Sequence, residues 1–155
     1  MTGTEHFGAI IRKLPTLLER LRSSPVITRQ DLAKVPERGI YVFYEDGRPV
    51  YVGRSRRMRA RLREHGQQSS DRYSATFALL LAQEEAEERG IDCKSMRKAQ
   101  LVQDNRFQPL FLAAKERVAR MAVRCVEIED PVEQTLFEVY AALALDTQYN
   151  VFDTH

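Results

Sequence analysis

GIYVFYEDGRPVYVGRSRRMRARLREH, residues Gly39–His65, contains two strand-like segments joined by a turn signal and followed by a run of arginines. Its β-branched and aromatic residues predict strands at about 40–45 and 49–53, and Asp46-Gly47 between them is typical of a tight turn. We therefore predict a β-hairpin. The stretch that follows, residues 56–65, suits a helix.

The positive charge of the chain is concentrated in this stretch. The 155 residues include 24 Lys or Arg and 22 Asp or Glu, a formal net charge of +2. Seven arginines lie between residues 48 and 63, so the rest of the chain is net acidic, and the charge is localised rather than diffuse. They are Arg48, Arg54, Arg56, Arg57, Arg59, Arg61 and Arg63.

The remaining residues extend the hairpin into an α+β fold. Residues 122–128, AVRCVEI, alternate as a third strand, and helical periodicity is found before, between and after the strands. We predict a small central three-stranded antiparallel sheet, at about 40–45, 49–53 and 122–128, flanked by helices. The last helix is expected from Asp130-Pro131 to about Leu145.

The predicted domain organisation is a single domain spanning residues 1–155, because the length supports one sizeable core. Residues 1–38 form a helical lead-in. Residues from about 70 to 121 form a helical insertion between the second and third strands.

Nothing in the sequence indicates a membrane or an oxidising compartment. No segment approaches the roughly 18 uninterrupted apolar residues of a membrane span, and the N-terminus lacks the basic-then-apolar layout of a signal peptide. Cys93 and Cys125 lack metal-ligand spacing, so we expect two buried, reduced thiols. We expect a cytoplasmic protein without a membrane partner.

The hairpin loop determines whether Tyr41 and Tyr51 share one face of the sheet. A two-residue loop at Asp46-Gly47 pairs Tyr41 with Val52 and places Tyr51 on the opposite face, whereas a three-residue loop pairs Tyr41 with Tyr51. Asp-Gly is compatible with both loops, so the register stays open. Without a shared face, both tyrosines are ordinary strand aromatics.

The arginine-rich helix has one arginine near its apolar stripe. At 100° per residue, Met58, Leu62 and His65 share a stripe and Arg61 lies at its edge. A guanidinium near the core needs an anion, so a phosphate contact and an internal salt bridge are both open for Arg61. His65 is either a proton-transfer residue or a helix-end residue, and its spacing favours the latter.

Two residues near the C-terminus are further site candidates. Glu138 is the only charge between Gln134 and Leu145, and a buried carboxylate requires a cation, either arginine or metal. Asn150 lies where an amide can hold a phosphate or bind the backbone. We interpret Glu138 as a functional carboxylate.

In this order, these residues resemble the GIY-YIG endonuclease family. Gly39-Ile40-Tyr41 matches the first signature, and Tyr51-Val52-Gly53 matches the second with a conservative valine. Arg61, ten residues after Tyr51, corresponds to the family's helix arginine. Glu138 corresponds to its metal-binding glutamate and Asn150 to its C-terminal asparagine.

Further positions refine the resemblance, which covers about residues 39–65 and 122–150. Arg54 lies where the excision-repair branch carries lysine, and His65 lies where some homing-endonuclease and restriction-type members carry histidine. Two features depart from the family pattern. Thr147 replaces a proline often found three residues before the asparagine, and the helical stretch before the third strand is longer than the minimal domain needs.

The resemblance implies a metal-dependent endonuclease that hydrolyses phosphodiester bonds of nucleic acid, expected to be DNA. Glu138 would bind one Mg²⁺ or Mn²⁺. Tyr41 would activate the attacking water and Tyr51 would position it, while Arg61, assisted by Arg54, would neutralise the phosphate oxygens. His65 and Asn150 complete the predicted catalytic set. The residues expected to attract the nucleic-acid backbone are Arg54, Arg56, Arg57, Arg59 and Arg63.

Two other kinds of protein fit the same residues. A non-catalytic nucleic-acid-binding module would use the arginines to hold phosphates and the tyrosines to pack or stack. An interaction protein would direct the arginines at an acidic partner, such as the acidic run at residues 84–88. A protein partner for specificity fits the nuclease prediction as well, and the oligomeric state is open.

Overall fold

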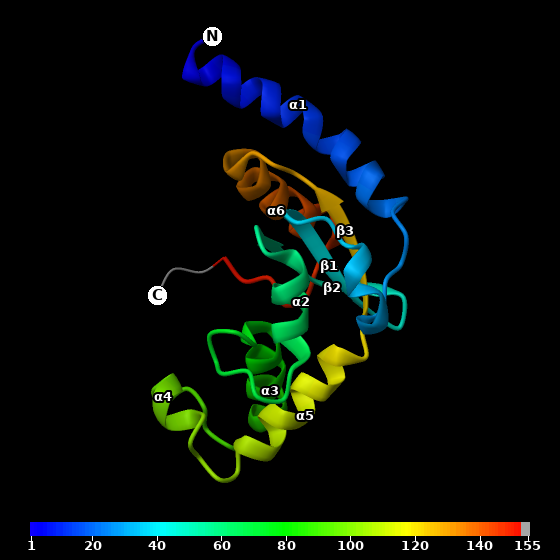
Figure 1. Ribbon diagram of the computed structural model, residues 1–155. Coiled ribbons are helices and arrows are strands. Elements are labelled where there is room, and N and C mark those ends of the chain that lie inside the picture. Colours follow the sequence, from blue (N-terminus) through cyan, green and yellow to red (C-terminus); the bar gives the residue numbers. More distant parts are fainter. Residues whose placement is uncertain (153–155) are drawn as a thin grey trace. The chain divides into compact units, whose positions relative to one another are not determined.

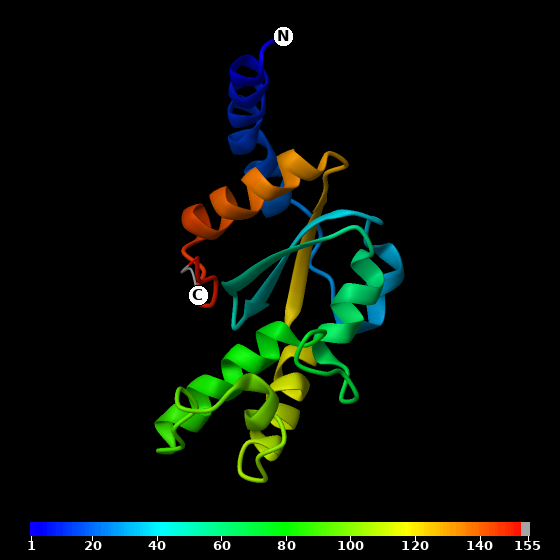
Figure 2. The ribbon, with the colours of Figure 1, turned by 90° about the vertical axis from the view of Figure 1, so that its left-hand side faces the viewer.

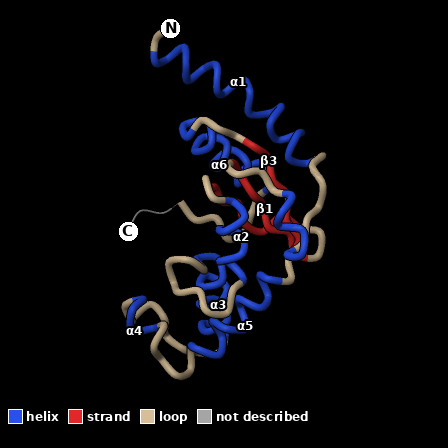
Figure 3. The backbone as a smooth tube through the Cα atoms, in the orientation of Figure 1, coloured by secondary structure: helices blue, strands red, loops and turns tan. Residues whose placement is uncertain are grey.

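The structure, a computed structural model, describes residues 1–152, and the chain divides into two compact units (Figure 1). Unit 1 consists of Met1–Arg59 with Ala122–His155, and unit 2 consists of Ala60–Met121. In the described residues, every strand lies in unit 1. The strands are red in Figure 3. Unit 2 is built from helices and loops, and it contains the whole of the predicted helical insertion, about residues 70–121.

The elements follow the predicted order. Unit 1 contains α1 (Gly3–Arg22), the short 3-10 helix η1 (Arg29–Lys34), β1 (Gly39–Glu45), β2 (Arg48–Ser55), β3 (Ala122–Glu127) and α6 (Pro131–Leu145). Helix α2 (Met58–Gly66) begins at the end of the first segment of unit 1 and continues into unit 2. Unit 2 also contains α3 (Thr76–Glu88), α4 (Lys98–Leu101) and α5 (Gln108–Ala119). The predicted three-stranded antiparallel sheet with flanking helices is confirmed.

The strands form an antiparallel sheet in the order β2-β1-β3, so β2 is an edge strand. Asp46 and Gly47 both have positive φ, at 51° and 77°, and Glu45 pairs with Arg48. This geometry is that of a two-residue hairpin turn, which Asp-Gly favours. The loop is therefore the shorter of the two considered from the sequence.

A β-bulge then shifts the register. Tyr44 pairs with Pro49, whereas Phe43 pairs with Tyr51, so Val50 is an extra residue on β2. Proline has no N–H to donate to a partner strand, and a bulge in an edge strand accommodates it. As a result Tyr41 pairs with Gly53, and neither register considered from the sequence is correct.

The core of unit 1 lies on one face of this sheet. Helices α1 and α6 pack there against Ile40 and Val42 of β1 and Val52 of β2 (Figures 1 and 2). Helix α1 supplies an apolar stripe at helical spacing, and Phe137 of α6 is fully buried in the same cluster. The α1 residues are Ile10, Leu14, Leu17, Leu18 and Leu21.

Unit 2 has its own packing. Helices α3 and α5 lie against each other, and Phe77 of α3 is fully buried. Phe107 and Phe111 stack with ring centroids 6.1 Å apart. These large buried side chains make unit 2 a compact helical body.

Both cysteines match the expectation of buried, free thiols. Burial raises the pKa of Cys125 to about 12, so this thiol is protonated at neutral pH. Among the helices of residues 1–152, none combines the length and the apolar character that a membrane span requires.

Candidate active site

Tyr41 and Tyr51 lie on the same face of the sheet, opposite the face that packs on α1 and α6. Strand alternation places Tyr41 and Phe43 together, and Tyr51 pairs directly with Phe43. The Tyr41 and Phe43 rings meet edge to face, with centroids 5.7 Å apart. Tyr41 is 2% exposed, whereas Tyr51 is partly exposed. The bulge, rather than a three-residue loop, therefore brings the two tyrosines to one face.

The two signature glycines are explained by close approach. A Cβ at Gly53 would overlap the ring and the hydroxyl of Tyr41, so that ring lies across β2, and its hydroxyl lies over the edge strand. Gly39 has a φ of +148°, and a Cβ there would overlap the carbonyl oxygen of Val126. Glycine at both positions is required for the sheet to pack as it does.

Asn150 binds the outer edge of β2. Its Nδ2 donates to the Val52 carbonyl at 2.8 Å, and its Oδ1 accepts from the Val52 N–H at 2.7 Å. Thr147 donates its hydroxyl to Asn150 Oδ1 at 2.7 Å, and the Tyr149 N–H donates to the Val50 carbonyl. Of the two roles open from the sequence, the structure shows the backbone contact, and it places Asn150 beside Tyr51 and Gly53 in β2.

Glu138 on α6 lies beside Arg54 of β2. The Arg54 Nε is 3.7 Å from Glu138 Oε2, and Arg54 also donates to the Pro131 carbonyl and to Thr135 Oγ1. The Glu138 side chain is 28% exposed. Burial raises the pKa of Glu138 above its usual value, and the Arg54 charge opposes that rise. The prediction that Glu138 has a cationic partner is thus confirmed, and the partner is arginine.

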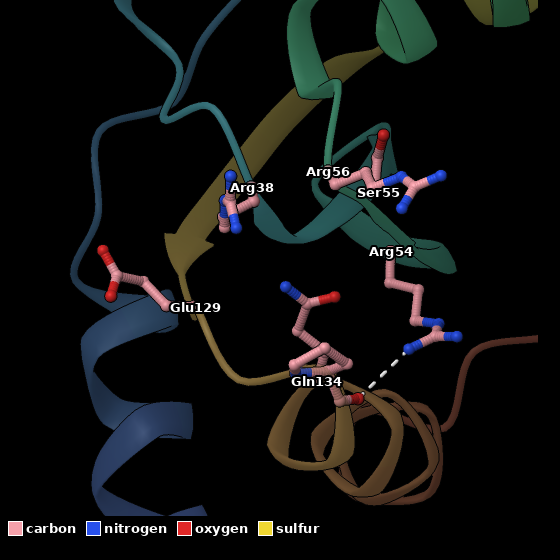
Figure 4. Close-up of a pocket in the computed structure, with 7 residues that line it drawn as sticks. Arg38, Arg54, Ser55, Arg56, Glu129 and Gln134 are labelled. Carbon is pink, nitrogen blue, oxygen red and sulfur yellow. Dashed lines mark hydrogen bonds between the residues drawn. The ribbon is translucent and has the colours of Figure 1, made fainter.

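An arginine-lined cavity of about 420 Å³ adjoins this ion pair. Figure 4 shows that its walls come from the start of β1, the end of β2 and the start of α6, and it marks the bond from Arg54 to Pro131. Three guanidinium groups, from Arg38, Arg54 and Arg56, line it together with a single carboxylate, Glu129. Its net charge therefore favours an anionic ligand.

Arg61 and His65 lie in unit 2. Arg61 donates to the Ser74 carbonyl at 2.8 Å and to Thr76 Oγ1 at 3.1 Å, and it lies 3.6 Å from Glu64. Its 21% exposure matches the predicted core-boundary position, and these contacts favour the internal role over the phosphate contact.

His65 is completely buried at the end of α2. Burial, assisted by the Arg61 charge, lowers the pKa of His65 from 6.5 to about 3. The imidazole is therefore neutral at physiological pH. This environment agrees with the helix-end role that the spacing favoured.

The remaining predicted arginines are exposed. Arg59 donates to the Ala33 carbonyl at 3.4 Å, and the backbone N–H of Arg57 donates to the Ser55 hydroxyl at 2.9 Å. Exposed guanidinium groups are available to a phosphate backbone. The exposed set is Arg54, Arg56, Arg57, Arg59 and Arg63.

The residues around Glu138 were compared with what a divalent metal requires. Within residues 1–152, no three His, Cys, Asp or Glu side chains are grouped to hold a metal ion. Mg²⁺ is commonly bound through one or two carboxylates, with waters and substrate phosphates completing the shell. A single, partly buried carboxylate beside an anion-attracting cavity fits that mode, and it does not fit a cage made wholly of protein ligands.

Among the residues that line the cavity, only Arg54 and Arg56 were predicted as site residues from the sequence, and Arg38 and Gln134 are two that were not. Arg38 directly precedes the first signature, and Gln134 begins the apolar stretch of α6, where its Nε2 donates to the Ile128 carbonyl. Their roles depend on α6 starting beside the first residues of β1, which is a tertiary contact. A basic residue adjoining the signature was the available signal for Arg38.

No protein-family model, no curated protein and no solved structure matches the chain. The resemblance to GIY-YIG endonucleases therefore stays a prediction that rests on the residues themselves.

Proposed function

We propose that the chain is a metal-dependent endonuclease of the GIY-YIG type that hydrolyses phosphodiester bonds in DNA. The observation that carries this proposal is the Arg54–Glu138 pair at the edge of the arginine-lined cavity. A cationic cavity attracts phosphate, and a partly buried carboxylate beside it provides a ligand for a metal that binds phosphate. Neither group is needed to complete the apolar core of unit 1.

The placement of the tyrosines supports the same proposal. The Tyr41 hydroxyl lies over Gly53, and Arg54 is the next residue of β2. The Tyr41 hydroxyl, from β1, and the Arg54 side chain thus lie at adjacent residues of the edge strand β2, on opposite faces of the sheet. A phosphodiester bound across the β2 edge would lie near both kinds of group.

The residues have distinct roles in the proposed reaction. Arg54 moves from Glu138 to the phosphate and neutralises its non-bridging oxygens, as a planar guanidinium does well. Tyr51, which is partly exposed, orients the attacking water, and its hydroxyl takes the proton of that water as it releases its own proton to solvent. Buried Tyr41 packs over Gly53 and against Phe43 and holds this face of the sheet in place. Arg38 and Arg56 hold the flanking backbone.

Glu138 would hold a Mg²⁺ or Mn²⁺ ion, which when bound stabilises negative charge on the phosphate and the leaving oxygen. The raised pKa of Glu138 reflects a carboxylate whose charge is incompletely compensated by Arg54. A second positive charge at this position would lower that pKa. Arg61 and His65 stay predicted catalytic residues, and the proposal does not depend on them.

A cleavage assay tests the proposal. Purified protein is incubated with plasmid, single-stranded and branched DNA in Mg²⁺, Mn²⁺ or EDTA. We expect cleavage that requires metal and is lost in Glu138→Gln. The matched control is Glu133→Gln on the same helix, whose carboxylate lies 3.7 Å from Lys13 instead. Activity that survives in Glu138→Gln, or no cleavage of any substrate, would refute the mechanism.

The second candidate function is a non-catalytic nucleic-acid-binding module. Arg54 already provides Glu138 with a cationic partner, 3.7 Å away. Such an ion pair can have a purely structural role. This candidate predicts DNA binding that falls in Arg56→Ala and persists in Glu138→Gln, without cleavage by either protein. Arg48→Ala, at the other end of β2, is the charge control.

A further inference from the structure

A second cavity, of about 390 Å³, lies within unit 2 and differs in character from the arginine-lined cavity. Phe111 and Leu112 of α5 contribute apolar surface to it, and Tyr73 and Arg72 of the preceding loop contribute an aromatic ring and a cation. Its volume lies within the range of small-ligand sites, roughly 300–1,000 Å³. Both an aromatic surface and positive charge are thus present in one concave site.

Tyr73 is the outstanding feature of this cavity. It is 69% exposed, although a tyrosine ring gains more by burial. The Arg72 guanidinium lies 4.6 Å from the ring centroid, and Arg72 donates to the Tyr73 hydroxyl at 2.6 Å. Arg72 lies over one face of the ring, so the other face of this exposed ring can stack a base while the arginine attracts the phosphate of that base.

The loop that carries Tyr73 is braced by side chains of unit 2. Lys115 donates to the carbonyls of Gln68 and Ser70, and it is only 6% exposed. Asp71 accepts from the backbone N–H groups of Tyr73 and Ser74, at 3.0 and 2.9 Å. A loop held in this way loses little conformational freedom when it binds a ligand. The exposed ring is therefore presented on a pre-organised support.

Polar groups at the cavity can bind the edge of a base. Asp71 is a carboxylate, since its hydrogen bond from the Ser74 backbone lowers its pKa, and Gln108 supplies an amide. Carboxylates and amides are among the side chains that hydrogen-bond to base edges. Lys115 Nζ lies 4.4 Å from the Phe111 ring centroid and keeps that ring in place at the apolar wall.

We propose that this cavity binds an unstacked nucleobase of a single strand. The inference rests on the proposed nucleic-acid function and deepens it, because it names the form of nucleic acid that unit 2 recognises. Tyr73 stacks on the base, Arg72 attracts its phosphate, and Phe111 with Leu112 form the apolar wall. Paired bases inside a duplex cannot reach such a site.

Fluorescence anisotropy in EDTA tests this inference without cleavage. The probes are a labelled single strand of about 12 nucleotides, the same strand with abasic sites, and the corresponding duplex. We expect Tyr73→Ala to weaken single-strand binding about tenfold, Tyr73→Trp to retain it, and duplex binding to be unchanged. The abasic strand should bind the wild type as weakly as the intact strand binds Tyr73→Ala. Phe7→Ala, which removes an exposed aromatic of unit 1, is the control and should bind like wild type.

The outcomes separate the two proposals. Equal single-strand binding by wild type and Tyr73→Ala would overturn the base site and leave the nuclease proposal standing. Equal weakening on single strand and duplex would also overturn it, because a phosphate contact would then explain the loss. If the wild type binds none of the three probes, the nucleic-acid function fails together with the base site.

Discussion

The packing of Tyr41 over Gly53 leads to a quantitative prediction about Gly53→Ala. The new methyl group would overlap the ring and the hydroxyl of Tyr41, at separations that real Cβ atoms essentially never show. Tyr41 is 2% exposed and meets Phe43 edge to face, so its ring has little room to move away. Overpacking of this kind costs about 1–3 kcal/mol, and we expect the upper end of that range.

The same substitution should be harmless when the ring is absent. Leucine at position 41 ends before the atoms that Gly53→Ala would meet, so Tyr41→Leu removes the overlap while keeping an apolar side chain. Alanine is also favoured over glycine in a strand by about 0.5–1 kcal/mol. Gly53→Ala should therefore be neutral or slightly stabilising in the Tyr41→Leu background. The coupling energy of the double-mutant cycle should be about 3 kcal/mol.

Urea unfolding of the four proteins, followed by far-ultraviolet circular dichroism, measures this coupling. Asp46→Asn in the hairpin turn serves as a control that leaves the Tyr41 contact intact. If Gly53→Ala costs the same in both backgrounds, the ring does not lie over Gly53 and the packing described for the signature is wrong. Cleavage activity is a second measurement on Gly53→Ala. Because the new methyl group displaces the Tyr41 hydroxyl, we expect this variant to cleave DNA more slowly than wild type.

Three further predictions concern the other candidate residues. Burial lowers the pKa of His65 to about 3, so below pH 6.5 this side chain binds a proton in the unfolded chain but stays neutral in the folded chain. The free energy of unfolding should therefore fall as the pH drops. This loss amounts to roughly 5 kcal/mol once the pH is below both pKa values. The urea midpoint of unfolding should depend less on pH between pH 7 and 4 in His65→Leu than in wild type. Burial raises the pKa of Glu138, so its charge opposes folding as pH rises through that pKa; Glu138→Gln should melt higher than wild type at pH 7 and equally at pH 3. Asn150→Asp places a carboxylate oxygen against the Val52 carbonyl and should cost about 1–3 kcal/mol in thermal unfolding, whereas Asn105→Asp, on an exposed loop, should cost nothing measurable.

The fold was predictable because its signals are local. Strand-forming residues, an Asp-Gly turn and an Asp-Pro helix start each determine structure within a few neighbours, and the observed strands begin and end within two residues of the predicted ones. Helix α6 begins at Pro131 with Asp130 accepting from the Glu133 N–H, as its sequence predicts. Such elements need little tertiary information.

The register was not predictable from the loop alone. Loop length is one variable and Pro49 adds a second one, because a residue without an N–H favours an edge strand and a bulge. The bulge reverses the consequence of the two-residue loop and brings Tyr51 to the face of Tyr41. A proline two residues after the turn was the available sequence signal.

The site was only partly predictable, and the missing part is tertiary. Helical periodicity placed Arg61 correctly at a core boundary, but its partners are the Ser74 carbonyl, in a loop, and the Thr76 hydroxyl, at the start of α3, and no pattern identifies them as partners. Arg38 and Gln134 reach the arginine-lined cavity only because α6 starts beside β1. Spacing thus identifies residues that need a partner, and packing determines which partner they find.

Glu138 is the residue for which folding and the proposed function make opposite demands. Burial raises the pKa of Glu138 because it disfavours the charged carboxylate. An apolar or amide side chain at this position would carry no charge and would avoid that cost, and the helix around it is otherwise apolar. Arg54 compensates the charge only in part, at 3.7 Å and with 43% of its own side chain exposed. Under the proposed function, a carboxylate that stabilises the fold less than a neutral isostere would is explained by the metal ion that it would bind. If Glu138→Gln proved less stable than wild type at pH 7, the ion pair would be structural and this reason for assigning Glu138 to a metal would be lost.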